Sequence, residues 1–253
     1  LAIRSATLHD IEQGGTEAAA IGAFITDRIV RCHLETMARL NVYYDLLAHE
    51  SDILTLQFWA TAFEILKREG AVFLQQQGPL AGCWVMPIAD RDHEDAPGAL
   101  PAVEGTADDA DSAEAREKVI VRSNGTVTYV GKDLAYQFWK FGLLGRDFRY
   151  RGFSRQRNGV LLWVTTSDPA AGEATAPAFG HAAAVYNVID VRQSYLQQLL
   201  RQGLTAIGHP EEAERSVHFS YEMVALSHQT ARQLGYGADS AEPGRPFVEV
   251  SGR

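Results

Sequence analysis

The sequence predicts an α/β protein organised around a parallel β-sheet. Short apolar strands alternate with amphipathic helical segments along most of the 253 residues, and this alternation is typical of parallel sheets whose strands are joined by crossover helices. The strand at residues 183–190 (AAVYNVID) is the most apolar in the chain, as expected of a central parallel strand. A hydrophobic content of 46% and an aromatic content of 9% suit a globular protein with a sizeable core.

The N-terminal part of the chain is predicted to begin with a long helix. Apolar residues recur at helical spacing over residues 16–40, and the charged residues between them have the pattern of a solvated face. A short buried strand is predicted at residues 42–47. Residues 71–87 have the pattern of a hairpin that turns at Gly78-Pro79.

A second helix is predicted over residues 52–69, with Ser51 as its N-cap and Gly70 at its C-terminal end. Glu50 would then lie just outside the helix, at a turn between a strand and a helix. Open α/β sheets place ligand-contacting residues at such turns. The alternative is a surface glutamate beside a helix cap, and spacing alone favours that alternative.

Residues 118–148 have the pattern of a strand, a tight turn, a second strand and a helix. Asn124-Gly125 is a dipeptide that tolerates the positive φ angles of a two-residue hairpin turn. Residues 127–130 are predicted to form the returning strand, and Asp133 is placed to cap the helix that follows. Gly145 is predicted to end that helix.

The pair formed by Tyr129 and Asp133 is the strongest candidate for a functional site. A phenol at the end of a strand and a carboxylate at the start of the next helix can project into one pocket. The structural alternative is that Asp133 only caps the helix and Tyr129 only covers the sheet. The spacing by itself favours this alternative.

The C-terminal part repeats the strand–helix alternation. A strand is predicted at residues 159–166, and a helix over residues 194–204 follows the apolar strand at 183–190. Gln193 would therefore lie between a strand end and a helix start. The remaining predicted elements are a short helix from Pro210, a strand at 217–226, a helix at 227–234 and a last strand at 247–250.

Two segments are predicted to lack regular structure. Residues 88–117 hold ten acidic residues and two arginines, so they contribute −8 to the net charge of −9 and leave the rest of the chain near neutral. Their composition predicts a flexible acidic loop without a site of its own. Residues 168–178 form a second loose insert, so the chain is predicted to be one partial domain over residues 1–253.

Several classes of protein are excluded by the sequence. No apolar run approaches the length of a membrane-spanning helix, and no leader precedes the first helix, which favours a cytoplasmic protein. Cys32 and Cys83 have no C-x-x-C spacing and no ligand-spaced histidines, so free thiols and no metal site are expected. No glycine-rich dinucleotide motif, P-loop or nucleophile elbow is present.

Five segments, taken in order, resemble arginyl-tRNA synthetases. The most specific is S-N-G-T-x-T-Y-x-x-x-D-x-A-Y at residues 123–136, followed by W-K-F-G-L-L. The others are CHLETMARL at 32–40, YDLLAHES at 44–51, VIDVRQ at 188–193 and HFSYEMV at 218–224. The resemblance covers most of the chain apart from the two inserts.

The resemblance implies a class I synthetase catalytic domain with a Rossmann-like parallel sheet and helical and hairpin insertions. Members of the family are enzymes that use ATP, with Mg²⁺ expected, to join L-arginine to its tRNA through an arginyl-adenylate. On the matching positions, Glu50, Tyr129 and Asp133 would bind the guanidinium of arginine. Gln193 would contact its amino-acid end, and His218 and Phe219 would lie beside the ATP adenine.

Two acids suit this substrate, because a guanidinium is always charged and presents its donors in a planar fork that carboxylates accept bidentately. The family's two ATP signature motifs are expected outside residues 1–253, so the catalytic residues are not assigned. The chain is expected to be a fragment that is inactive alone. The alternatives are a non-catalytic paralogue that binds arginine or tRNA, and another class I synthetase or nucleotidyl-transferring domain.

The role of the long N-terminal helix also stays open. Arg31 and His33 belong to its polar face, which is expected to be solvated. The resemblance adds the alternative that these two residues touch tRNA, which the spacing does not decide.

Overall fold

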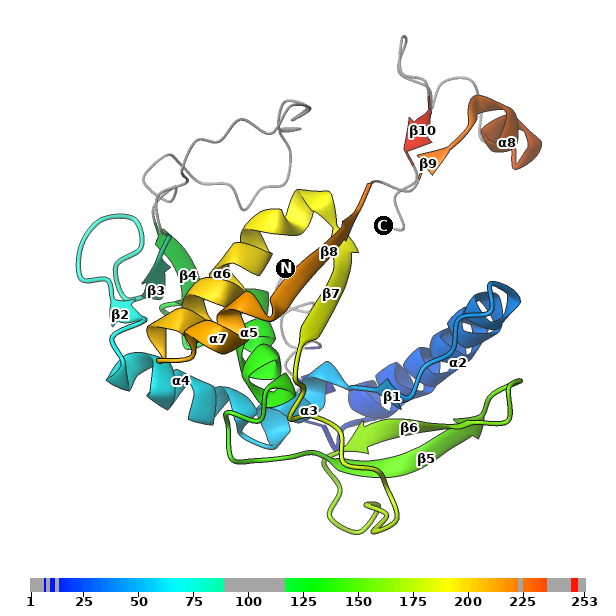
Figure 1. The fold of residues 1–253 in the computed structure, drawn as a ribbon, viewed down its shortest axis with the longest axis horizontal. Coiled ribbons are helices and arrows are strands. Elements are labelled where there is room, and N and C mark those ends of the chain that lie inside the picture. Colours follow the sequence, from blue (N-terminus) through cyan, green and yellow to red (C-terminus); the bar gives the residue numbers. More distant parts are fainter. Residues whose placement is uncertain are drawn as a thin grey trace.

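The computed structural model describes residues 7, 10–11, 14–88, 117–222, 225–235 and 247–249. Helices and strands alternate along these residues, which confirms the predicted α/β class (Figure 1). The acidic loop at residues 89–116 lies outside the described residues, as does most of the chain after residue 235. Residues 168–178 contain neither a helix nor a strand.

The elements follow one another with these bounds. They are α2 (Glu17–Arg39), β1 (Leu46–Leu47), α3 (Glu50–Thr55), α4 (Phe58–Arg68), β2 (Phe73–Leu74), β3 (Trp84–Pro87), β4 (Glu117–Val121), α5 (Tyr129–Lys140), β5 (Arg149–Arg155), β6 (Leu161–Thr166), β7 (Val185–Asp190), the 3₁₀ turn η2 (Val191–Gln193), α6 (Ser194–Ala206), α7 (Pro210–Glu214), β8 (Ser216–Tyr221), β9 (Ala225–Leu226), α8 (His228–Gln233) and β10 (Val248–Glu249).

The described strands form four small sheets. Two of them contain parallel pairs: β1 with β6, and β7 with β8. β5 adds to β6 in the antiparallel sense, β2–β3–β4 is antiparallel, and β9 pairs with β10. Among the described residues β7 has only β8 as a neighbour, and its Tyr186 and Val188 are exposed. The central position predicted for β7 is therefore wrong for the part of the chain that the structure describes.

The core lies between α4, α5 and α6. Phe58, Leu134, Phe138 and Leu204 are almost completely buried there. α5 and α6 approach closely at Gly203, where an added Cβ would come within 2.6 Å of a methyl group of Leu134. This contact explains why a glycine occurs inside α6 despite its low helix propensity, and it fixes the position of α6 against α5.

Two predicted helices begin and end at other residues than the sequence indicated. The segment predicted as one helix over 52–69 consists of α3 and α4, because Gln57 between them has a positive φ of 58°. α3 also begins at Glu50 rather than after Ser51. A turn at Asn124-Gly125 is confirmed, with Gly125 at φ 83°. It contains three residues rather than the predicted two, because the Arg122 N–H donates to the Thr126 carbonyl at 2.9 Å and the Gly125 N–H donates to the Arg122 carbonyl at 2.8 Å.

The strand predicted at 127–130 is wrong. Only Val127 pairs, through an isolated bridge to Val121, and α5 already begins at Tyr129. Thr128 takes the N-cap position, and its hydroxyl donates to the carbonyls of Val119 and Ile120 at 3.0 and 3.1 Å. These bonds turn the chain directly from the hairpin into the helix. The helix ends at Lys140, five residues before the predicted end at Gly145.

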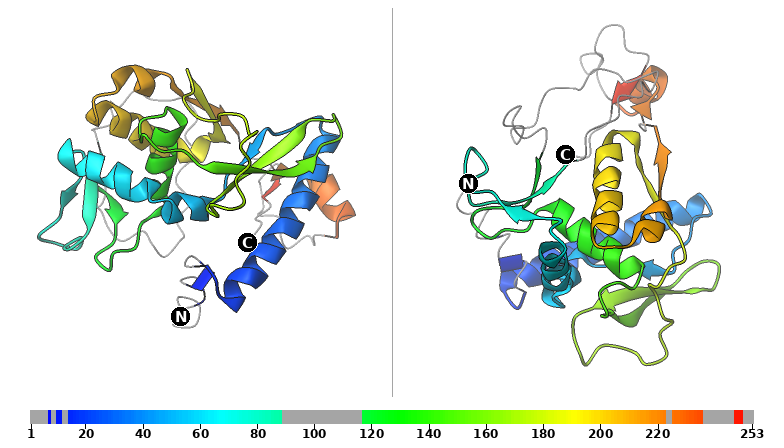
Figure 2. Two further views of the ribbon diagram at one scale, coloured as in Figure 1. Left: turned by 90° about the horizontal axis from the view of Figure 1, so that it is seen from below. Right: turned by 60° about the vertical axis from the view of Figure 1, so that its left-hand side comes forward.

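The long N-terminal helix α2 is confirmed, with Thr16 as its N-cap accepting from the Ala19 N–H at 3.1 Å. None of its residues is buried, and Phe24 of the predicted apolar face is 64% exposed. α2 lies beside the β5–β6 hairpin, away from α4, α5 and α6 (Figure 2). No helix in the described part of the chain combines the length and the hydrophobicity needed to cross a bilayer.

Candidate functional site

The first turns of α5 carry Tyr129 and Asp133 on one face, because residues four apart in a helix lie above one another. Tyr129 is the first helical residue, and its side chain is 56% exposed. Asp133 lies in the second turn and is half-buried. It is therefore not the helix cap that the sequence predicted, and its carboxylate is available for another role.

Glu50 lies next to this face of α5. It begins α3, and its carboxylate is 2.9 Å from the ammonium group of Lys132. Lys132 is largely buried, whereas the Glu50 side chain is 67% exposed. Because one partner is open to water, the pair contributes little to stability. Another cation can therefore replace Lys132 beside Glu50, at the edge of the site.

The carboxyl group of Asp133 is held in an environment that disfavours its charge. Burial raises its pKa to about 6, and the negative charge of Glu50 acts in the same direction. Lys140 and Lys132 oppose this shift without cancelling it. Among the described residues, Asp133 has no hydrogen bond or ion pair. The site therefore contains a half-buried acid whose carboxylate has no close positive partner among the described residues.

Lys140, the last residue of α5, lies on the same helix face about two turns after Asp133. Its ammonium group donates to the side-chain oxygens of Asn187 at 3.1 Å and Gln137 at 3.3 Å, and it lies 4.6 Å from the ring centre of Tyr136. Burial lowers its pKa to about 8, although the charge of Asp133 acts in the other direction. Asn187 belongs to β7, so Lys140 joins α5 to the β7–β8 pair. Nothing in the sequence pattern marked this lysine beyond its place seven residues after Asp133.

Tyr129 faces the start of α6. The ammonium group of Lys118, from β4, lies 5.8 Å from the ring centre of Tyr129 and 5.3 Å from that of Tyr195. Burial lowers the pKa of Lys118, but its interactions with the two tyrosine hydroxyls more than offset this, and the net shift is upward. Gln193 lies two residues before Tyr195, at the N-cap of α6, and it is exposed. The structure thus brings Tyr129 near the start of α6, where Gln193 occupies the N-cap position without a capping hydrogen bond from its side chain.

His218 and Phe219 lie on β8, in register with Asn187 and Val188 of β7. The His218 ring nitrogen Nε2 is 3.0 Å from the carbonyl of Ile189, which holds the ring against the adjacent strand. Phe219 is 62% exposed. Both residues therefore lie on the strand pair whose carboxyl end leads into Gln193.

A buried hydrogen-bond cluster fixes α3, and sequence patterning did not predict it. Thr165 of β6 donates to the Asp52 carboxylate at 2.6 Å and accepts from the His49 N–H at 2.8 Å. The Asp52 carboxylate lies 3.8 Å from the His49 ring nitrogen Nδ1 and raises the pKa of His49. Burial alone would raise the pKa of Asp52, but the nearby His49 ring and the hydrogen bond from Thr165 make the net shift downward. The segment H-E-S-D held one signal, a histidine and an acid three residues apart at a helix start.

Two cavities in the described residues lie away from this site. One of about 370 Å³ lies between α6 and α7, and one of about 290 Å³ lies between α2 and the β5–β6 hairpin. Within the described residues, no group of three or more histidines, cysteines or acids is placed to hold a metal ion.

The structure resembles that of Thermus thermophilus arginyl-tRNA synthetase, with a TM-score of 0.60 and 34% sequence identity over 79% of this chain and 30% of that chain. The fold is therefore that of an aminoacyl-tRNA synthetase. Arginine–tRNA ligases from Deinococcus radiodurans and Thermus thermophilus are each 36% identical, over 92% and 87% of this chain. The ligase from Thermococcus kodakarensis is 31% identical over 86% of it.

The chain belongs to the arginyl-tRNA synthetase family, as its sequence motifs indicated. It spans about a third of the length of these relatives: 34% of the Deinococcus protein and 32% of the Thermus protein. A comparison with models of protein families found no match.

Proposed function

We propose that this chain supplies the arginine-binding part of an enzyme that joins L-arginine to its tRNA. The reaction consumes ATP and passes through an arginyl-adenylate. The proposal is supported by relatives that are named arginine–tRNA ligases and that match 92% and 87% of this chain. One observation in the structure carries it further: Asp133 is a half-buried acid without an ion pair among the described residues, and Glu50 lies beside it.

The guanidinium of arginine fits the charges of this site. Two neighbouring carboxylates repel one another, and a delocalised cation between them removes that repulsion. Its donors are arranged in a planar fork, so it can serve Glu50 and Asp133 together, whereas the ammonium of lysine is a point charge. In this proposal the guanidinium takes the place of Lys132 beside Glu50 and supplies Asp133 with its missing partner.

The remaining substrate contacts are assigned to four other residues. The Tyr129 hydroxyl meets the guanidinium from the start of α5, and Gln193 contacts the amino-acid end from the start of α6. His218 and Phe219 lie beside the adenine of ATP. Mg²⁺ is expected to accompany ATP, since it is commonly bound through substrate phosphates together with one or two carboxylates. A cytoplasmic location is part of the same proposal.

The decisive experiment is arginylation by the complete protein. Transfer of labelled arginine to tRNA should depend on ATP and should not occur with labelled lysine. Arginine binding, measured by calorimetry, should persist when ATP is left out. Arginine or tRNA binding without any transfer would contradict the enzymatic proposal and favour a non-catalytic binding protein.

The affinity for arginine is expected to fall in mild acid. Asp133 has a pKa of about 6 in the absence of arginine, and only its ionised form offers the guanidinium a charge. Above pH 7 the acid is ionised, and affinity should be constant. Below pH 6 a proton must leave before arginine binds, so the dissociation constant should rise about tenfold per pH unit. Calorimetric titrations between pH 5 and 8 check this, and a flat profile would contradict an ionised Asp133 in the site.

Replacing Tyr129 by phenylalanine should weaken arginine binding specifically. The loss of one hydrogen bond to a charged group costs roughly 1.5–3 kcal/mol, which corresponds to a rise in the KM for arginine of about tenfold to a hundredfold. The exposed ring should keep its place at the start of α5, so stability should not change. Steady-state kinetics test this, with the KM for ATP as the control. Equal changes in both KM values would show that Tyr129 is structural.

A further inference from the structure

The β5–β6 hairpin is the most basic segment of an acidic chain. Residues 149–166 contain four arginines and no acidic residue, whereas the whole chain has a net charge of −9. α2, which lies beside the hairpin, contains three acids and three arginines and is neutral overall. The surface that the two elements form together therefore carries a charge of +4.

A cavity of about 290 Å³ opens between α2 and the hairpin. Arg31 lines it from α2, and Arg155 and Arg157 line it from the hairpin; Glu35 is the only acid in the lining. Tyr43 adds one aromatic side chain to the same wall. The groove thus combines planar cations with a ring, the combination that binds phosphates and stacks on bases in RNA complexes.

The walls of this groove are held in place by contacts that do not use its outer charges. The Gln156 side chain accepts from the Tyr44 N–H at 3.0 Å and donates to the Tyr44 carbonyl at 2.7 Å, which fastens the hairpin to the segment before β1. The Arg31 guanidinium lies 4.5 Å from the ring centre of Phe153 and forms two hydrogen bonds to Asp27. Arg31 is therefore a fixed, neutralised wall of the groove.

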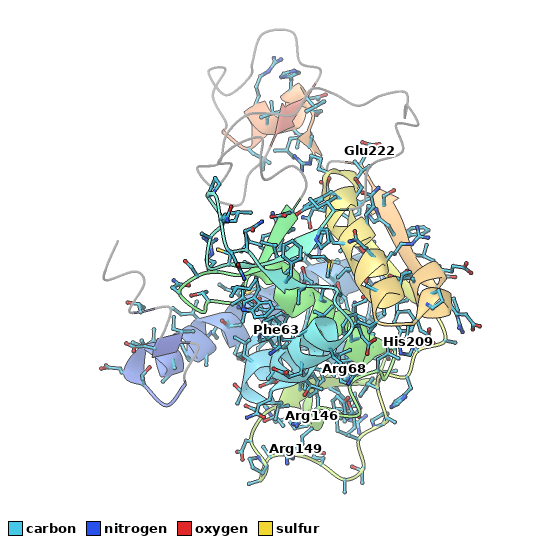
Figure 3. All side chains as sticks on the ribbon, turned by 90° about the vertical axis from the view of Figure 1, so that its left-hand side faces the viewer. Phe63, Arg68, Arg146, Arg149, His209 and Glu222 are labelled. Carbon is cyan, nitrogen blue, oxygen red and sulfur yellow. The ribbon has the colours of Figure 1, made fainter. Side chains whose placement is uncertain are left out.

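Arg155 and Arg157 carry the charge that remains available. Arg155 donates to the Gly159 carbonyl at 3.1 Å, a contact that leaves its charge without a counter-ion. Arg157 makes no hydrogen bond or ion pair with the described residues. Arg155 and Arg157 are both exposed. Arg146 and Arg149, labelled in Figure 3, lie where the chain leaves α5 and enters the hairpin. Acids accompany them there, since Asp147 lies between the two arginines and the Glu173 carboxylate accepts from the Gly152 N–H of β5 at 2.8 Å.

We infer that this groove binds the phosphodiester backbone of tRNA, with Arg155 and Arg157 as the phosphate-contacting residues. The inference rests on the proposed function for the identity of the RNA. Geometry and charge point to a polyanion, because Arg155 and Arg157 have no ion pair among the described residues and can contact phosphates. A polyanion also releases its condensed counterions when it binds such cations. In this proposal Arg31 forms part of the groove wall, and its charge stays paired with Asp27.

The test compares two double variants of the complete protein. Arg155→Gln/Arg157→Gln removes the proposed phosphate contacts. Arg68→Gln/Arg215→Gln removes two exposed arginines at the ends of α4 and α7, each of which is paired with a glutamate. α4 and the turn of the hairpin lie at opposite ends of the molecule (Figure 1). Binding of fluorescently labelled tRNA is measured between 50 and 300 mM salt, on the order of the range over which phosphate contacts weaken binding.

The hairpin variant should bind tRNA at least about tenfold more weakly, and the salt dependence (the slope of log K against log salt) should fall by roughly 1 for each lost arginine. The control variant should behave as the wild type. Arg155→Lys/Arg157→Lys should restore most of the affinity because it keeps both charges. The KM values for arginine and ATP should be unchanged in all variants.

Equal tRNA affinity and equal salt dependence in the hairpin and control variants would overturn the inference. A loss of affinity that the lysine variant does not restore, together with a lower melting temperature, would also overturn it, because the arginines would then be structural. Failure of the proposed function is a different result: the wild-type protein would bind tRNA through the groove but would transfer no arginine.

Discussion

Asp133→Asn in the complete protein is expected to reduce arginine-dependent activity by about two to three orders of magnitude. Removing one partner from a buried ion pair costs roughly 3–5 kcal/mol, and each 1.36 kcal/mol corresponds to a factor of ten. In the proposed complex Asp133 is the buried partner of the guanidinium, and asparagine keeps its size but not its charge. The measurement is kcat/KM for arginine at pH 7.5, with the KM for ATP as the internal control.

The stability of the Asp133→Asn variant separates a substrate role from a structural one. The pKa of Asp133 is raised to about 6 in the folded protein, above the ordinary aspartate value of 3.8, so its ionisation opposes folding. The folded state therefore binds more protons than the unfolded state between pH 4 and 6, and wild-type stability should fall as pH rises through that window. Asparagine removes this loss. The variant should be as stable as the wild type at pH 5 and at least as stable at pH 7, and a large fall in melting temperature would assign Asp133 to the structure.

Thr165→Val is expected to cause a large loss of stability, although valine has nearly the same shape as threonine. Valine removes the 2.6 Å hydrogen bond to Asp52 and the acceptor for the His49 N–H, while the β-branched shape that suits β6 stays. A hydrogen bond to a charged group contributes roughly 1.5–3 kcal/mol, and an unsatisfied buried group costs about 1–3 kcal/mol more. The free energy of unfolding, measured in urea, should therefore fall by about 3 kcal/mol or more. The KM for arginine should also rise, because the cluster fixes the helix that begins at Glu50.

Thr61→Val is the matched control for this prediction. Thr61 has the same side chain and donates to the Gln57 carbonyl at 3.1 Å on an exposed part of α4, so its replacement should have little effect. Thr165→Ser should retain most of the stability because it keeps the hydroxyl. If Thr165→Val and Thr61→Val lowered stability equally, the His49–Asp52–Thr165 cluster would not anchor α3.

The sequence predicted the parts of the structure that local patterning decides. Periodicity indicated the long helix α2, and the turn residue at Gly125 indicated the turn that follows β4. The order of five short motifs along the chain was sufficient to identify the family. Each motif alone is a weak signal, but the five in this order are specific. The same motifs selected Glu50, Tyr129 and Asp133, and the structure places Glu50 beside the helix α5 that carries Tyr129 and Asp133.

Local patterning could not decide where a helix begins when a tertiary contact intervenes. The chain leaves the hairpin early because the Thr128 hydroxyl bonds to the carbonyls of Val119 and Ile120, which moves Asp133 from a cap into the second turn of α5. The break at Gln57 has no signal in the helical pattern of residues 52–69. The early start of α5 depends on the contact between Thr128 and β4.

The electrostatics of the site are a product of the tertiary structure as well. Lys140 influences Asp133 because both are partly buried on one face of α5, and it is held there by Asn187, which lies 47 residues further along the chain. Thr165 meets Asp52 across 113 residues. The sequence by itself determined the residue types, most of the helices and strands, and the family. Only the packing of distant segments decided which charges face one another, since burial and proximity set the strength of an electrostatic interaction.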